Sequence, residues 1–239
     1  MATALLFERD SVDELDDWSQ LPRLGRSTVL WIDLDSPDEA EVGRLADVFD
    51  LHEETRASLL DLPDQPALHD YHEYLQVTAC APADDERSLV AITCLVSKRW
   101  LVTAHAGRLE VLETFRERAA ASGDTGHLEA PEFLANVLEW VFASYYDAFE
   151  DVELVLEEID ASSMAGDLDG KEEALARLVE VRREIGRLRR ALTSHREVAC
   201  HSLDPSSTES RAHPARSGSR RFEDGWRTRS RRLGTAASR

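Results

Sequence analysis

The side chains best placed for chemistry in this sequence are carboxylates that stand next to one another. Asp84, Asp85 and Glu86 form one run of acids, and Glu150 with Asp151 forms another. Clustered carboxylate oxygens suit a weak contact with a hard cation such as Mg²⁺ or Ca²⁺. The competing interpretation is a solvated loop and a solvated helix face, which is the commoner fate of such runs.

No arrangement typical of an enzyme accompanies these acids. His52-Glu53 is not a zinc-protease motif, because Arg56 stands where the second histidine must be. The sequence also lacks a Gly-rich phosphate loop and a nucleophile elbow. These observations predict a protein that is not an enzyme.

Histidine and cysteine residues give no stronger metal site. Residues 69–73 hold two histidines, an aspartate and a glutamate, but on a strand their side chains would point alternately to opposite faces. A solvated strand edge is therefore favoured over a transition-metal site. Cys80, Cys94 and Cys200 have no metal-ligand spacing, and their odd number argues against a disulfide framework. Reduced thiols indicate a cytoplasmic setting.

Two heptad patterns in residues 131–200 predict a pair of long helices joined by a polar turn. Their apolar positions alternate three and four residues apart, which places them on one stripe of each helix. The first stripe comprises Leu134, Leu138, Val141, Tyr145, Ala148, Val152, Val155 and Ile159; the second comprises Leu178, Val181, Ile185, Leu188, Leu192, His195 and Ala199. Gly166, Asp167, Asp169 and Gly170 interrupt the pattern and mark the turn.

The two predicted helices carry opposite charges. Residues 131–160 contain nine acids and no Lys or Arg, whereas residues 171–200 contain eight basic residues and five acids. An exposed ion pair adds only about 0–1 kcal/mol, so these charges set orientation and partner choice while the apolar stripes supply the stability. One reading of the chain is thus a soluble α/β adaptor that docks a partner helix through an acidic coiled-coil hairpin.

The first 125 residues predict an α/β fold with a mixed, partly antiparallel sheet of about five strands flanked by helices. The expected strands are residues 3–8, 27–34, 71–80, 89–97 and 100–105, and a short helix is expected within residues 10–20. The predicted organisation is an α/β domain over 1–125, a helical hairpin over 126–200 and a disordered basic tail over 201–239.

Charge and hydropathy restrict the partners. The 239 residues carry a net charge of −19, and the tail is net +5, so residues 1–200 carry −24 and would repel nucleic-acid phosphates. No stretch approaches the roughly 18 apolar residues that cross a bilayer, and the N-terminus is not a secretory signal. The tail is rich in Arg, Ser, Ala, Pro and Gly, as a GC-rich gene read out of frame would be. That origin is favoured over a functional tail.

The order of motifs resembles the CorA family of magnesium and cobalt channels. The resemblance covers residues 25–200 and rests on six pieces: Trp31-Ile32-Asp33-Leu34; Leu59-Leu60-Asp61 followed by Gln65-Pro66; Asp70-Tyr71 to Leu75; Leu95–Val102; the acidic helix Tyr146–Ile159; and Leu188-Arg189-Arg190 to Arg196-Glu197-Val198.

This resemblance implies a cytoplasmic α/β domain, an acidic helix pair and the start of a stalk helix that leads to the membrane. Family members form homopentamers, and divalent ions bound between cytoplasmic domains hold the closed state. It further implies regulatory binding of Mg²⁺ or Co²⁺ with no organic cofactor. Asp84 and Asp85 are then weak candidates for one half of a site shared between subunits.

The sequence departs from the family where the pore would be. Its methionines are Met1 and Met164, so the Gly-Met-Asn pore signature is absent. The resemblance therefore predicts a cation-sensing region truncated before the pore, which does not transport alone and forms a monomer or a weak oligomer. Membrane association follows only by analogy with the family.

Overall fold

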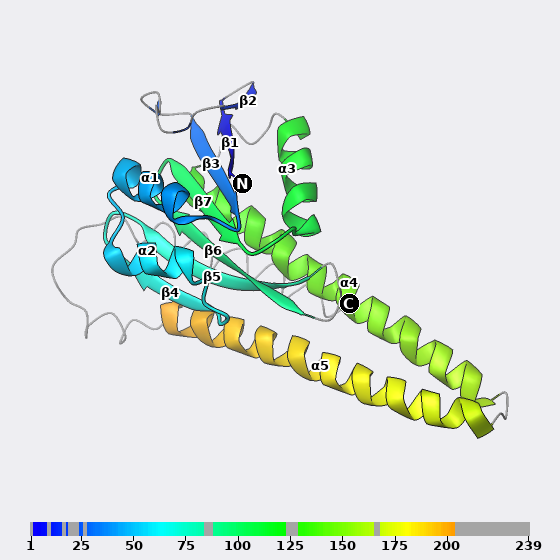
Figure 1. Ribbon diagram of the computed structural model, residues 1–239. Helices are drawn as coiled ribbons and strands as arrows, with labels where there is room; N and C mark the ends of the chain where they lie inside the picture. The colour runs from blue at the N-terminus through cyan, green and yellow to red at the C-terminus, as the bar shows by residue number, and fades with distance from the viewer. Residues whose placement is uncertain are drawn as a thin grey trace.

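A seven-stranded sheet between two layers of helices forms the body of the protein, and a long helical hairpin extends from it (Figure 1). The computed structural model describes residues 2–8, 11–15, 18, 24–25, 28–83, 88–122, 129–164 and 168–203. The strands are β1 (Ala2–Phe7), β2 (Val12–Glu14), β3 (Val29–Asp35), β4 (Ala67–Asp70), β5 (Leu75–Pro82), β6 (Leu89–Val96) and β7 (Trp100–His105). The helices are α1 (Glu39–Phe49), α2 (Glu53–Leu60), α3 (Glu110–Ser122), α4 (Ala130–Met164) and α5 (Leu168–Leu203).

The strand order is β2-β1-β3-β7-β6-β5-β4, and the sheet is mixed. β3 and β7 run parallel with Asp33 opposite Thr103, while the other paired strands run antiparallel. The predicted fold class is confirmed. The number of strands is seven rather than about five, because β2 and β4 are short edge strands with weak sequence patterns.

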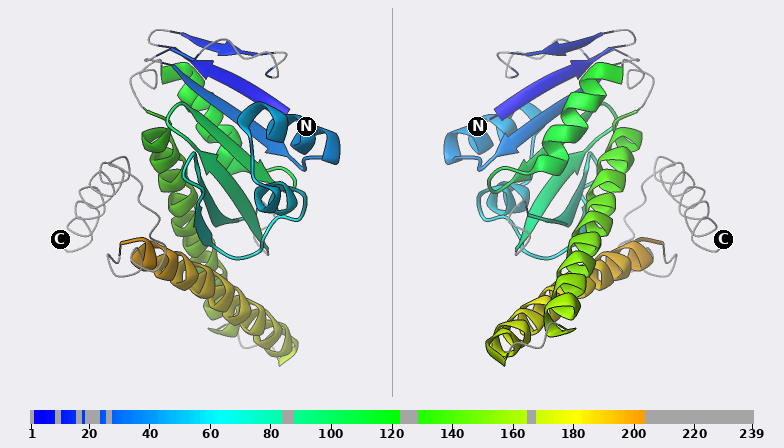
Figure 2. Two further views of the ribbon diagram at one scale, coloured as in Figure 1. Left: turned by 90° about the vertical axis from the view of Figure 1, so that its left-hand side faces the viewer. Right: turned by 90° about the vertical axis from the view of Figure 1, so that its right-hand side faces the viewer.

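Strand alternation divides the core into two clusters. Leu30, Ile32 and Leu34 of β3 face α1 and α2, whereas Val29 and Trp31 face α3 and the first half of α4. Figure 2 shows these helix pairs on opposite sides of the sheet. Successive side chains of a strand point to opposite faces, so a nearly continuous apolar run can supply both clusters.

The hairpin of α4 and α5 begins against the sheet and returns to it. The first turns of α4 belong to the core that covers Trp31, and α5 runs back along α4 until it lies beside β4 and β5 (Figure 1). Two small apolar clusters hold the helices together, one around Tyr145 and Leu188 and the other around Val152 and Val181. The predicted division between residues 125 and 126 stays a prediction.

Three local expectations are wrong. Residues 12–14 form β2 within the segment expected to hold a short helix, because they complete a hairpin with β1. Residues 71–74 separate β4 from β5, so they are not the start of one strand. Leu178 is 40% exposed, because α5 has one helical neighbour here and the covered strip runs through Ala174 and Val181.

The ends of the hairpin helices also differ from expectation. Asp169 and Gly170 lie within α5 rather than in the connecting turn, and α5 continues to Leu203. Gly166, Asp167 and residues 204–239 lie outside the described part of the chain, so the expected disorder of the tail stays a prediction.

Candidate functional site

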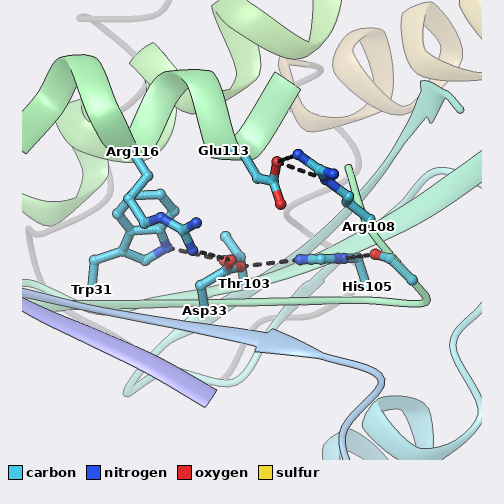
Figure 3. Close-up of polar contacts among 8 residues, drawn as sticks. Trp31, Asp33, Thr103, His105, Arg108, Glu113 and Arg116 are labelled. Carbon is cyan, nitrogen blue, oxygen red and sulfur yellow. Dashed lines mark hydrogen bonds and ion pairs between the residues drawn. The ribbon is translucent and has the colours of Figure 1, made fainter. Parts of the chain in front are cut away.

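A buried carboxylate on β3 is the centre of a polar cluster between the sheet and α3. Asp33 follows Trp31 on the same face of the strand and is 9% exposed. The Thr103 hydroxyl on neighbouring β7 donates a hydrogen bond to Asp33 Oδ1, and Trp31 Nε1 donates to Thr103 Oγ1 at 3.0 Å (Figure 3). The parallel register of β3 and β7 brings the three side chains together.

His105, at the end of β7, is the partner of this carboxylate that can carry a positive charge. Its Nε2 lies 3.3 Å from Asp33 Oδ1, within the range of an ion pair. Its Nδ1 lies 2.7 Å from the carbonyl oxygen of Gly107, which can only accept, so Nδ1 carries a proton. When Nε2 is also protonated, the ring is an imidazolium that faces the Asp33 carboxylate.

The electrostatics of His105 support that assignment. Burial alone lowers the pKa of this imidazole, but the hydrogen bond and charge of Asp33, the Gly107 carbonyl and the Asp35 charge together raise it above the ordinary 6.5. The net direction of the pKa shift is upward because these influences together outweigh desolvation, which is the largest single one.

Arginines of α3 and of the segment before it border the cluster. Arg116 NH1 lies 4.0 Å from Asp33 Oδ2 and is partly exposed, whereas Arg108 is paired with Glu113 at 2.6 Å. Arg116 thus places a guanidinium near Asp33 from α3 (Figure 3). The polar contacts tie β3, β7 and α3 together.

A second polar constellation joins the hairpin to the sheet. Cys80 N–H on β5 donates to His195 Nε2 at 2.9 Å, and Tyr145 OH donates to the Cys80 carbonyl at 2.8 Å. His195 Nδ1 lies 2.7 Å from the Ala191 carbonyl on its own helix. One residue of β5 is therefore bonded to both helices of the hairpin.

Thiols beside these groups are unreactive by environment. Burial, followed by the nearby charge of Asp64, raises the pKa of the Cys80 thiol to about 11. Burial, followed by the charge of Asp33, raises the pKa of Cys94 to about 12. Both are buried free thiols.

Comparison with known proteins places this architecture in a family. The model of the CorA-like Mg²⁺ transporter protein family matches residues 26–218. The chain belongs to this family. A search of curated proteins found no match.

Solved structures of low sequence identity share the fold of this CorA-like chain. The complete CorA magnesium transporter from Methanocaldococcus jannaschii matches with a TM-score of 0.68 at 17% identity, covering 94% of this chain and 68% of that one. The soluble domain of the same transporter matches with a TM-score of 0.68 at 16% identity, covering 92% and 85%. The ZntB cytoplasmic domain from Vibrio parahaemolyticus matches with a TM-score of 0.59 at 15% identity, covering 86% and 83%.

These matches confirm the predicted family and fold. The CorA-like α/β body and hairpin are present, and none of the helices described here has the length and apolarity needed to cross a membrane. The family is one of transporters, which agrees with the expectation that the chain is not an enzyme.

The predicted cation ligands lie outside the described residues of this CorA-like chain. Asp84 and Asp85 fall in the segment 84–87 between β5 and β6, next to the backbone bond from Ala83 N–H to the Ser88 carbonyl. Within the described ranges, no three His, Cys, Asp or Glu side chains are grouped so that they could hold a metal ion. Asp84 and Asp85 therefore stay predictions.

The structure also places the other acidic motifs that the sequence singled out. Asp70 Oδ1 accepts the His72 N–H at 2.9 Å in the turn between β4 and β5, where His72 has a positive φ of 70°. Glu150 is exposed on α4, and Asp151 is half-buried there.

The polar residues that the sequence reasoning missed are Asp33, Thr103, His105 and His195. Asp33, Thr103 and His105 interrupt otherwise apolar buried strands, and that interruption is a usable signal for a paired internal charge. His195 stood on the predicted apolar stripe, but nothing near it in the sequence pointed to Cys80.

Proposed function

We propose that this chain is the cytoplasmic, divalent-cation-sensing region of a CorA-like transporter and that it does not transport ions by itself. The family match over residues 26–218 carries the proposal. The similarity to the soluble domain of an archaeal CorA supports it at the level of fold. The absence of a Gly-Met-Asn signature from the sequence supports the second part.

Charge supports a response to Mg²⁺. Residues 131–160 of α4 hold nine acids without Lys or Arg. Among the described residues, one ion pair joins α4 to α5, between Arg177 and Glu158 at 2.7 Å. Eight of the nine acids are exposed and Asp151 is half-buried, so cations that approach the helix can relieve the repulsion between their charges. Asp84 and Asp85 are the proposed ligands of a weak specific site, with Co²⁺ as an alternative ion.

Thermal melting of the full chain tests the proposal. If the site binds Mg²⁺ with a Kd of about 1 mM, 10 mM Mg²⁺ adds about 1.4 kcal/mol to the free energy of unfolding. For a chain of this length, that gain raises the Tm by about 3–6 °C. NaCl at equal ionic strength reproduces screening but not coordination, so it should give a smaller, non-saturating shift.

Matched variants separate the proposed ligands from general acidity. Asp84→Asn with Asp85→Asn should weaken the saturable Mg²⁺ gain, whereas Asp47→Asn with Glu117→Gln removes two exposed carboxylates elsewhere and should leave it intact. A Mg²⁺ response that NaCl fully reproduces would refute cation sensing. If both double variants lose the saturable Mg²⁺ gain equally, the assignment of Asp84 and Asp85 as ligands is refuted.

The oligomeric state belongs to the same proposal. We expect a monomer or weak oligomer in the cytoplasm, because the resemblance assigns the pentamer contacts to the stalk and the membrane segments. Sedimentation with and without Mg²⁺ measures this directly. A stable pentamer that tightens with Mg²⁺ would show that the cytoplasmic region alone carries the assembly interface.

A soluble adaptor is the second candidate, and exposed apolar side chains on the hairpin favour it. Leu154 of α4 is 58% exposed, and Leu175 and Val179 of α5 are 62% and 49% exposed. Large apolar side chains on a surface helix pair are typical of a site that docks another helix. Stoichiometric capture of a helical partner that Leu175→Glu abolishes, without any response to Mg²⁺, would favour this function over cation sensing.

A further inference from the structure

The sheet has an unpaired edge at the point where the hairpin attaches. β4 pairs with β5 only as far as Thr78, opposite Ala67, whereas β5 continues to Pro82. In the part of the chain that the structure describes, no strand lies on that side of Cys80 to bond its backbone N–H and carbonyl. A buried backbone group without a partner costs free energy, so something else must satisfy both.

Side chains of the two hairpin helices take the place of the missing strand. Tyr145 of α4 donates its hydroxyl proton to the Cys80 carbonyl at 2.8 Å, and His195 of α5 accepts the Cys80 N–H at 2.9 Å. Tyr145 is 2% exposed and His195 is 9% exposed, so water does not compete freely for either bond.

The bond to Cys80 requires one protonation state of His195. A backbone N–H can only donate, so Nε2 must hold a lone pair, and Nδ1 beside the Ala191 carbonyl must hold the proton. The docked ring is therefore the neutral Nδ1–H tautomer. A second proton on Nε2 would place two donors face to face.

We propose that His195 is a proton-sensitive latch, which fastens the C-terminal turns of α5 to the free edge of β5 at neutral pH and releases them on acidification. Release requires only that a proton from solvent binds Nε2 in the undocked state, where no backbone donor opposes it. This inference is independent of the proposed response to Mg²⁺.

Among the residues that the structure describes, no carboxylate is paired with His195 to stabilise its charged form. From α4 it meets the rings of Phe142 and Tyr145, at centroid distances of 5.2 and 6.1 Å. From β5 it meets the backbone of Cys80. Burial lowers the pKa of His195, and the Ala191 carbonyl opposes this only in part.

Charged groups also lie around the point where α5 attaches to the sheet. The cleft beneath α5, of about 300 Å³, is bordered by Asp64 from the segment before β4 and by Arg187 and Arg190 from α5 itself. β4 brings the exposed His69 and Asp70, and Arg196 and Glu197 flank His195 on its helix.

The sign and size of the effect follow from linkage. The pKa of docked His195 lies below the ordinary 6.5. The bond to Cys80 is therefore fully effective above pH 6.5 and weakens as pH falls below it. In that window the ratio of released to docked α5 rises by up to about tenfold for each pH unit. The rise ends at the pKa of docked His195.

Cysteine labelling reports the release in the full chain. Cys80 borders the cleft that α5 covers, whereas Cys94 is fully buried in the sheet core and reports global unfolding. We would label with 4,4′-dithiodipyridine from pH 5.0 to 8.0, quantify each cysteine by peptide mass spectrometry and divide by the rate for glutathione at the same pH. The expected result is a rise in Cys80 labelling below pH 6.5, approaching tenfold per pH unit, with Cys94 unchanged.

Two variants and one control decide the role of His195. His195→Gln cannot titrate and should give a flat Cys80 profile, whether or not its amide keeps α5 docked. Tyr145→Phe removes the other bond to Cys80, so labelling should rise at every pH while its slope against pH stays that of the unmodified chain. His69→Gln replaces an exposed histidine and should change neither the rate of Cys80 labelling nor its dependence on pH.

The outcomes that overturn the latch are specific. A His195→Gln profile as steep as that of the unmodified chain would assign the pH response to another group. A Cys80 profile that is flat in the unmodified chain, or that rises only together with Cys94, would show that α5 is not released separately from global unfolding.

Discussion

Asp33→Asn tests whether a buried ion pair ties the sheet to α3. The substitution keeps the volume of the side chain and leaves an amide oxygen that can accept the Thr103 hydroxyl, but it removes the charge opposite His105. Breaking a buried pair by removing one partner costs about 3–5 kcal/mol. His105 can lose its proton rather than stay charged alone, which favours the lower value, about 3 kcal/mol.

The predicted loss is measurable in two ways. For a chain of this length, 3 kcal/mol lowers the Tm by about 6–12 °C in thermal melts followed by circular dichroism. The pKa of His105, followed by the NMR signal of its ring Cε1, should fall, because burial lowers it and the largest opposing influence, Asp33, is gone. Asp147→Asn makes the same chemical change at an exposed position of α4 and should stay within about 0.5 kcal/mol.

One combination of results would refute this reasoning. If the Asp33→Asn and Asp147→Asn variants have the same Tm and the pKa of His105 is the same in both, Asp33 is not the partner of His105 in solution. A large loss of stability without a change in that pKa would mean that Asp33 acts through Thr103 alone.

Two further outcomes are expected. Val152→Asp should lower the free energy of unfolding by several kcal/mol in urea titrations, because Val152 is 4% exposed in the hairpin cluster. Glu153→Lys, on the exposed side of the helix, should change it by about 0.5 kcal/mol or less. Equal effects of the two substitutions would mean that the helix register is wrong. His105→Gln should lower the free energy of unfolding most below pH 6.5, and the loss should shrink as pH rises through the raised pKa of His105. A loss of stability that does not vary between pH 5.5 and 8.5 would show that His105 is not charged in the native protein.

The local rules that succeeded on this sequence are those of short apolar runs and of heptads. Nearly continuous apolar runs located β1, β3, β6 and β7, because these strands bury side chains on both faces. Heptads located the hairpin and its first stripe, where Val141, Tyr145 and Val152 are all buried. The short strands β2 and β4 were missed because three or four residues are too few to show a period.

The features that the sequence did not predict depend on where the elements pack in three dimensions. Leu178 obeys the heptad but is 40% exposed, because a helix with a single neighbour covers a narrower strip than the pattern offers. The bond between Cys80 and His195 spans 115 residues of sequence, and its existence depends on where β4 stops pairing with β5. Neither local propensity nor spacing encodes such an event.

The two buried histidines have opposite effects on the pH dependence of stability. The pKa of His105 is raised in the native state, so its contribution is present below pH 6.5 and is lost as pH rises. The pKa of His195 is lowered, so its contribution is present above pH 6.5 and is lost as pH falls. The two windows meet near pH 6.5 without overlapping, so together they predict a maximum of Tm near that pH. The fall on the acid side belongs to His195 and the fall on the alkaline side to His105. Probes local to α3 and to α5 assign each side of the profile, and so separate an ion pair inside the body from the bond that attaches the hairpin.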